Sequence, residues 1–162
     1  MPRVANVVGS LQRSETITVQ RILVVDDEPM IRLLNTDILL EAGFLVDTAE
    51  DGAAAWDALQ LNNYDLLVTD NQMPNVCGVE LIVKLRVAGM VLPVIMATAT
   101  LPDETFTGHI WLQPFAMLLK PYSIAEFLGA VKSVLGATKL AGATAALVPN
   151  WESFPLAFGV RL

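Results

Sequence analysis

Short apolar segments that end abruptly in polar residues constrain the fold of this chain more than any other feature of its sequence. Residues 21–25 (Arg-Ile-Leu-Val-Val) are followed at once by Asp26 and Asp27. An aliphatic run of this kind is typical of a strand that is buried on both faces and ends at a polar edge. Pro29 then opens a segment with helical spacing of apolar residues, and Gly43 is placed to end it. The sequence therefore predicts a strand followed by a helix.

The same alternation of strand and helix repeats along the chain. The expected strands are 21–25, 44–48, 65–69, 93–97 and 115–119, and the expected helices are 29–42, 52–60, 78–87 and 124–135. The apolar stripe of the first helix is expected at Ile31, Leu34, Ile38 and Ala42. This order predicts an α/β fold, a doubly wound five-stranded parallel sheet with helices on both faces.

Two local features concern the last part of this pattern. A short or irregular helix is expected within 102–113, where Pro102 and Gly108 lower helix propensity. Ser123 is expected to be the N-cap of the final helix, because Glu126 stands at the third helical position as in a capping box.

Composition and charge narrow the classes of function. Hydrophobic residues make up 54% of the 162 residues and charged residues 17%, which suits one folded domain with a large buried core. The formal net charge of -7 argues against direct binding of nucleic acid, which depends on Lys and Arg. Cys77 is the only cysteine, so an internal disulfide and a multi-cysteine metal site are excluded, and a reducing cytoplasm is the expected location.

No segment has the pattern of a targeting signal or a membrane span. Residues 1–20 lack the continuous apolar core of a secretory signal, and Lys132 and Lys139 interrupt the apolar stretch 127–149. We expect residues 1–20 to be a flexible N-terminal extension, 21–136 the folded domain, and 137–162 an apolar C-terminal tail. The tail is expected to be poorly ordered, with docking on its own domain or on a dimer surface as the alternatives.

Polar side chains follow four of the expected strands at the end of each strand. They are Asp26 and Asp27, Asp70, Thr98 and Lys120. Because the carboxyl ends of parallel strands meet at one edge of the sheet, these side chains are expected to converge. Three crowded carboxylates need a compensating cation, and oxygen ligands suit Mg²⁺. A phosphoryl group on Asp70 would there meet the Lys120 ammonium and the Thr98 hydroxyl. Each residue alone is more simply a helix cap, a turn residue or a surface charge, so the inference depends on their convergence.

Four segments resemble the landmarks of response-regulator receiver domains: 22–28 (Ile-Leu-Val-Val-Asp-Asp-Glu), 66–74, 93–99 and 118–121. The resemblance covers about 21–135 and implies the flavodoxin-like (βα)5 receiver fold. It implies that Asp70 is the phosphoacceptor, and that Asp26, Asp27 and Asp70 hold Mg²⁺ together with the backbone carbonyl of Asn71. Thr98 and Lys120 would contact the phosphoryl oxygens.

The same resemblance implies a role in two-component or phosphorelay signalling. The donor would be a histidine kinase or a phosphotransfer protein, and the receiver would catalyse only its own phosphorylation and dephosphorylation. Phosphorylation would then switch the binding of an unknown downstream protein or the formation of a homodimer. Gln72 and Thr100 occupy positions that tune hydrolysis in the family, and the small Ala99 leaves the site open. The stretch after residue 135 is too short for an appended output domain, so a stand-alone receiver is expected.

Met117 departs from the family pattern, because a switching Tyr or Phe commonly stands three residues before the lysine. This departure favours an alternative, a pseudo-receiver that acts as a phosphorylation-independent interaction or dimerisation module. The acidic pair, Asp70, Thr98 and Lys120 oppose that alternative. A haloacid-dehalogenase-type hydrolase is disfavoured because Asp70-Asn71-Gln72 lacks a second aspartate. A flavin carrier is disfavoured because acidic residues follow the first strand, where they would repel the flavin phosphate.

Overall fold

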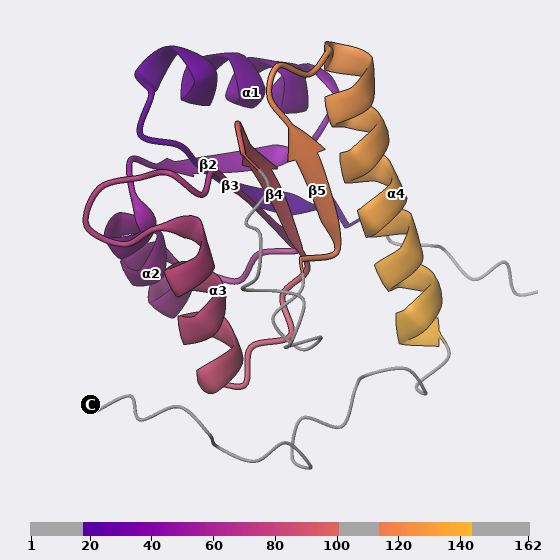
Figure 1. Cartoon of the computed structure of the whole chain (residues 1–162). Coiled ribbons are helices and arrows are strands. Elements are labelled where there is room, and N and C mark those ends of the chain that lie inside the picture. The colour runs from indigo at the N-terminus through magenta and orange to yellow at the C-terminus, as the bar shows by residue number, and fades with distance from the viewer. Residues whose placement is uncertain (1–17, 101–113, 144–162) are drawn as a thin grey trace, which may run out of the picture.

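The strands of this protein form one parallel sheet in the order β2-β1-β3-β4-β5 (Figure 1). The computed structural model describes residues 18–100 and 114–143. The strands are β1 (Arg21–Val25), β2 (Leu45–Ala49), β3 (Leu66–Thr69), β4 (Val94–Thr98) and β5 (Ala116–Leu119). The chain moves from β1 to β2 on one side and then to β3 on the other, so the strand order reverses between β1 and β3. The predicted doubly wound five-stranded parallel sheet is confirmed.

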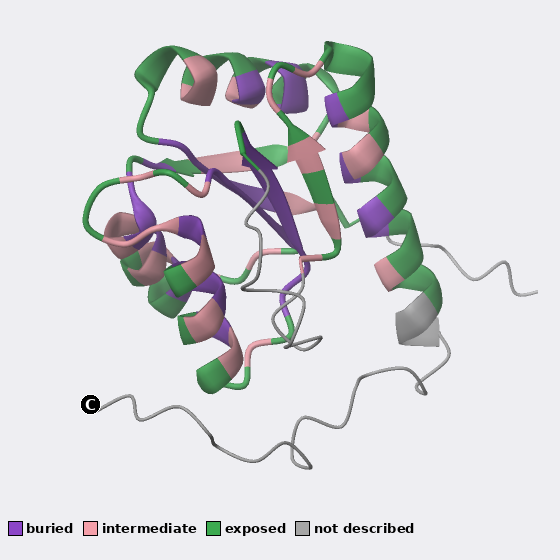
Figure 2. Ribbon diagram, viewed as in Figure 1, coloured by how far each residue is buried: buried purple, intermediate pink, exposed green. Residues whose placement is uncertain are grey.

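Two layers of helices enclose the sheet (Figure 1). Helices α1 (Pro29–Glu41) and α4 (Ile124–Ala143) cover one face, and α2 (Gly52–Leu61) and α3 (Gly78–Val87) cover the other. The central strands β1, β3 and β4 are almost entirely buried (Figure 2). Alternate residues of each strand face opposite cores; Leu23 packs toward α2 and α3, whereas Ile22 packs toward α1 and α4. A strand covered on both faces explains why its sequence is a continuous aliphatic run.

The local signals at the helix ends act as expected. Gly43 follows α1 with a φ of 89°, a left-handed conformation that glycine adopts at little steric cost. At the start of α4, the Ser123 backbone N–H donates to Glu126 Oε2 at 2.7 Å, and the Glu126 N–H donates to Ser123 Oγ at 3.2 Å. The predicted capping box is therefore confirmed.

Several predicted ends of strands and helices are wrong by one residue, and the predicted end of the last helix is wrong by more than two turns. Strand β2 begins at Leu45 instead of 44, and Thr98 is the last residue of β4 instead of the first residue after it. Helix α4 does not end near Leu135 but continues to Ala143. The sequence there is rich in Ala with Lys and Leu, all strong helix formers, and Gly136 lowers the propensity without ending the helix.

The buried face of α1 also differs from the prediction. Leu34 is 50% exposed and Ala42 is exposed, whereas Asn35, Ile38 and Leu39 are buried. Asn35 can occupy the inward face because its amide donates to the Tyr122 hydroxyl at 2.9 Å. A buried amide is tolerated when it has a hydrogen-bond partner, and hydrophobic spacing alone does not reveal that partner.

Three expectations lie outside the described residues. They concern most of the flexible extension at 1–20, the irregular helix within 102–113 and the part of the apolar tail from residue 144 onward. Among the helices in 18–100 and 114–143, none combines the length and the hydropathy needed to cross a membrane.

Candidate functional site

Three carboxylates meet at the carboxyl edge of the sheet, where the strand order reverses. Asp26 follows β1 and Asp70 follows β3, and both are buried, at 3% and 8% exposed. Asp27 is exposed beside them. One carboxylate oxygen from each residue lies within 4.8 Å of those of the other two. The donors are hard oxygens on one partly open site, and that donor set fits Mg²⁺.

Lys120 supplies the positive charge of the site. It follows β5, and its Nζ lies 2.7 Å from Asp26 Oδ2 and 3.1 Å from Asp70 Oδ2. Burial alone would lower the pKa of the Lys120 ammonium. The hydrogen bonds and charges of Asp26 and Asp70 outweigh burial and raise that pKa above its ordinary value. The lysine is therefore a fixed cation shared by two carboxylates.

The two oxygens of Asp70 have different partners. Oδ1 accepts hydrogen bonds from the backbone N–H groups of Asn71 at 2.6 Å and Gln72 at 3.3 Å. Oδ2 faces the Lys120 ammonium. The two backbone N–H groups and the ammonium together hold the Asp70 carboxylate in one orientation.

Residues after β3 and β4 are in contact next to Asp70. Gln72 Nε2 donates to Thr100 Oγ1 at 3.1 Å. Ala99, next to Thr100, is exposed. Thr98 is fully buried, and its hydroxyl donates to the Thr100 carbonyl at 3.1 Å. The Gln72–Thr100 hydrogen bond thus joins the segment after β3 to the segment after β4.

Met117 lies on the edge strand β5, opposite Met96 in the register with β4. Its side chain is 37% exposed. Met117 therefore lies on the edge strand that leads to Lys120, and it is partly exposed to solvent.

Arg32 is a site residue that sequence reasoning missed. It lies on α1, and its Nη1 donates to the backbone carbonyl of Asp26. The guanidinium therefore fixes the turn that carries Asp26 and Asp27. A basic residue one turn into the helix after the acidic pair was the available signal, but its contact with a backbone carbonyl depends on the tertiary structure.

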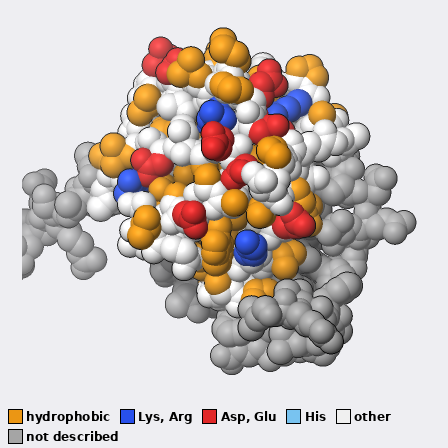
Figure 3. Space-filling view, turned by 90° about the vertical axis from the view of Figure 1, so that its left-hand side faces the viewer, with side chains coloured by type: hydrophobic (Ala, Val, Ile, Leu, Met, Phe, Trp, Pro, Cys, Tyr) orange, Lys and Arg blue, Asp and Glu red, His pale blue; other side chains and the backbone are white. Residues whose placement is uncertain are grey.

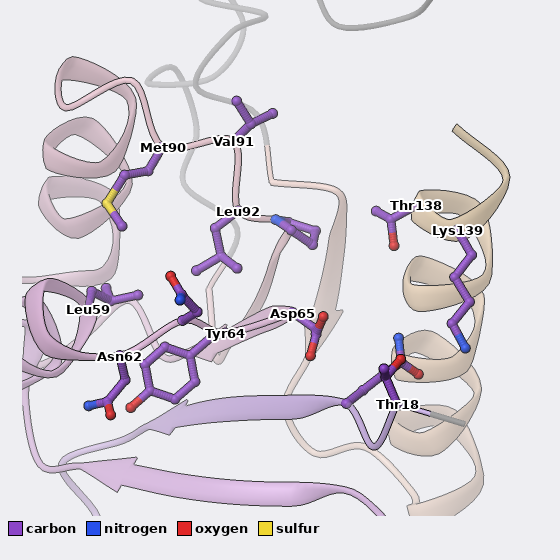
Figure 4. A pocket seen from close by; sticks show the side chains of 13 residues that line it. Thr18, Leu59, Asn62, Tyr64, Asp65, Met90, Val91, Leu92, Thr138 and Lys139 are labelled. Atoms are coloured by element: carbon purple, nitrogen blue, oxygen red, sulfur yellow. The ribbon is translucent and has the colours of Figure 1, made fainter. Parts of the chain in front are cut away.

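A separate hollow lies at the opposite edge of the sheet (Figure 4). Its volume is about 570 Å³, and residues that precede strands line it, including Gln20, Asp65 and Pro93. These positions are at the amino ends of β1, β3 and β4, away from the acidic cluster.

The side of the molecule drawn in Figure 3 shows acidic and apolar side chains interspersed, with few basic ones.

Comparison with known proteins gives a family and two kinds of relative. The sequence model of the response regulator receiver domain matches residues 22–132. The transcriptional regulatory protein CusR of Escherichia coli is 32% identical over 115 residues, which are 71% of this chain and 51% of CusR. The chain spans about half the length of the curated relatives it matches.

Solved structures agree in fold over the same region. The response regulator TrrA of Thermotoga maritima, in complex with Mg²⁺ and BeF, aligns with a TM-score of 0.63 at 33% identity, covering 72% of this chain and 99% of TrrA. The chemotaxis protein CheY4 of Vibrio cholerae aligns with a TM-score of 0.67 at 27% identity, again over 72% of this chain and 99% of CheY4. The similarity to both extends over nearly all of the other chain.

Proposed function

The chain belongs to the response regulator receiver domain family, and from this premise we propose that it takes a phosphoryl group onto Asp70 in a two-component or phosphorelay pathway. The observation that carries the proposal is the setting of the Asp70 carboxylate. It is buried, oriented by two backbone N–H groups, and placed beside Asp26, Asp27 and the Lys120 ammonium. The donor would be a phosphohistidine on a histidine kinase or phosphotransfer protein, and the output would be a changed affinity for another protein.

In the proposed reaction a carboxylate oxygen of Asp70 attacks the phosphorus of the donor. The bond from phosphorus to the donor nitrogen, or to the oxygen of a small acyl phosphate, breaks, and its electron pair leaves with the donor. The Lys120 ammonium, now shared between Asp26 and Asp70, would turn to the phosphoryl oxygens, and the Thr98 hydroxyl would exchange the Thr100 carbonyl for one of them. Positioning and charge neutralisation supply most of the catalysis in such transfers.

Receiver domains bind Mg²⁺ at an acidic cluster, and the cluster of this chain fits that ion. The residues that would hold it are Asp26, Asp27, Asp70 and the backbone carbonyl of Asn71. When bound, Mg²⁺ would neutralise part of the negative charge on the carboxylates and on the incoming phosphoryl oxygens.

The test is the intact mass of the protein after incubation with acetyl phosphate, with and without Mg²⁺. A gain of one phosphoryl group that requires Mg²⁺ is the expected result. No gain under either condition would reject the phosphoacceptor role and leave the pseudo-receiver, for which the exposed Met117 at the switch position is the favouring observation.

Lys120→Ala is expected to slow phosphorylation several-fold without unfolding the domain. Without Mg²⁺ the variant should also lose about 1–2 kcal/mol of stability, because Asp26 and Asp70 then repel each other without a shared cation. Added Mg²⁺ should restore more stability to this variant than to the wild type. Urea unfolding with and without Mg²⁺ measures the difference, with the exposed Lys132→Ala as control. Equal responses to Mg²⁺ would contradict the shared-cation role.

Gln72→Ala is expected to shorten the lifetime of the phosphorylated state a few-fold. The variant loses the hydrogen bond from Gln72 to Thr100, which joins the segments after β3 and β4 next to Asp70, so we expect water to attack the phosphorylated Asp70 more readily. Thr100→Val removes the same hydrogen bond from the other side, and the double variant should show no further change. The decay of the phosphorylated mass after removal of acetyl phosphate measures the lifetime. Additive effects of the two variants would show that the residues act separately.

A further inference from the structure

Asp51 is a buried carboxylate outside the acidic cluster, and the proposed chemistry does not use it. It precedes α2 and is 8% exposed. Its Oδ1 accepts a hydrogen bond from the Ala54 backbone N–H at 2.8 Å, as an N-cap does. Its Oδ2 accepts a second hydrogen bond, from the side-chain amide of Asn75. One oxygen is enough to cap a helix, so the hydrogen bond from Asn75 is a contact beyond the cap.

Asn75 belongs to the β3–α3 loop, residues 71–77, and its backbone conformation fits this contact. Its φ is 63°, in the left-handed region that Asn tolerates better than most residues. The loop is tied to α2 a second time, because the Gly52 N–H donates to the Val76 carbonyl at 3.2 Å. A Cβ at Gly52 would overlap the Val76 carbonyl oxygen. The start of α2 and the far end of the loop are thus in direct contact.

The near end of the same loop forms part of the site. The Asn71 and Gln72 N–H groups donate to Asp70 Oδ1, and the Gln72 side chain reaches Thr100. The Asn71 carbonyl accepts from the Met73 N–H at 3.2 Å and from the Gly78 N–H at 3.1 Å, so the position of Asn71 depends on the path of the whole loop. The loop therefore has one end anchored at Asp70 and the other at Asp51.

We infer that Asp51 is a positioning residue that holds the β3–α3 loop through Asn75, so that the Asn71 and Gln72 N–H groups stay directed at Asp70 Oδ1. The inference rests on the proposed function, since that function assigns Asp70, which these N–H groups orient, to the phosphoryl group and to Mg²⁺. The hydrogen bonds from Ala54 and Asn75 hold the pKa of Asp51 below its ordinary value, so the residue stays an anion that both donors can share.

Two variants separate the cap from the loop contact. Asp51→Ser keeps a good N-cap oxygen but is too short to reach Asn75. Asn75→Gly removes the amide and keeps a residue that adopts positive φ readily. Tyr64→Phe is the control for stability alone, because it removes the hydrogen bond from Tyr64 to Asp47 at the opposite edge of the sheet.

Two readouts need no phosphoryl donor. The first is the Mg²⁺ dissociation constant, from a titration followed by amide NMR shifts. It should rise about tenfold in both variants, the effect typical of a lost partner behind a metal ligand. The second is hydrogen exchange of the Asn71 and Gln72 amides without Mg²⁺, which should accelerate in both. The double variant should match the single ones, and Tyr64→Phe should leave both quantities unchanged.

The outcomes distinguish this inference from the proposed function. Wild-type affinity and wild-type exchange in Asp51→Ser and Asn75→Gly would overturn the positioning role, even if both variants were less stable than the wild type. A wild-type protein that neither binds Mg²⁺ nor takes up a phosphoryl group would overturn the proposed function. Faster exchange in the variants would still support the loop contact in that case.

Discussion

Replacing Asp70 with asparagine is expected to abolish the Mg²⁺-dependent phosphorylation of this chain and to leave its fold intact. The two side chains have nearly the same shape, but an amide is not a nucleophile. The side-chain carbonyl oxygen of the asparagine can accept the same hydrogen bonds from the Asn71 and Gln72 N–H groups that Asp70 Oδ1 accepts. Intact-protein mass after incubation with acetyl phosphate and Mg²⁺ should show one added phosphoryl group in the wild type and none in Asp70→Asn.

Asp65→Asn is the matched control for Asp70→Asn. Asp65 lies at the amino end of β3, where its carboxylate is exposed and accepts from the Arg21 backbone N–H at 2.8 Å. This variant should take up the phosphoryl group as the wild type does, and circular dichroism should show the same helix content in all three proteins. An undiminished mass gain in Asp70→Asn would mean that Asp26 or Asp27 is the acceptor and would contradict the assignment.

The convergence of Asp26, Asp70 and Lys120 could be predicted because it depends only on topology. Each residue directly follows an apolar strand, and parallel strands place their carboxyl ends along one edge of the sheet. The long Lys120 side chain then spans the distance from β5 to Asp70. The hydrophobic pattern of a single sequence is therefore enough to predict that these three side chains converge.

The contacts within the loops could not be predicted in this way. The Gln72–Thr100 and Asp51–Asn75 hydrogen bonds join segments that no periodic pattern relates. Asp51 before Gly52 is a recognisable N-cap signal, but nothing in the sequence indicates that its second oxygen reaches another loop. Buried polar pairs raise the same difficulty, because a residue such as Asn35 counts against a buried face until its partner is known.

Gly78→Ala is expected to destabilise the domain by about 2–3 kcal/mol and to slow phosphorylation at least tenfold. Gly78 is the first residue of α3 and is buried. An added Cβ would overlap the backbone carbonyl oxygen of Asp70 and lie 3.0 Å from the Asn71 Cα. Both neighbours are backbone atoms of Asp70 and Asn71, so the strain can be relieved only by moving that backbone or the start of the helix. Urea unfolding and the rate of mass gain with acetyl phosphate measure the two effects.

Gly129→Ala separates this clash from the general effect of replacing a glycine in a helix. Gly129 lies within α4, and an added Cβ there would meet no other atom within 4 Å. Alanine favours the helix by about 0.5–1 kcal/mol relative to glycine, so this variant should be more stable than the wild type and phosphorylated at the same rate. If Gly78→Ala unfolded at the wild-type urea concentration and reacted at the wild-type rate, the backbone at Asp70 would be free to shift. The close packing of α3 against Asp70 would then not be what orients the Asp70 carboxylate.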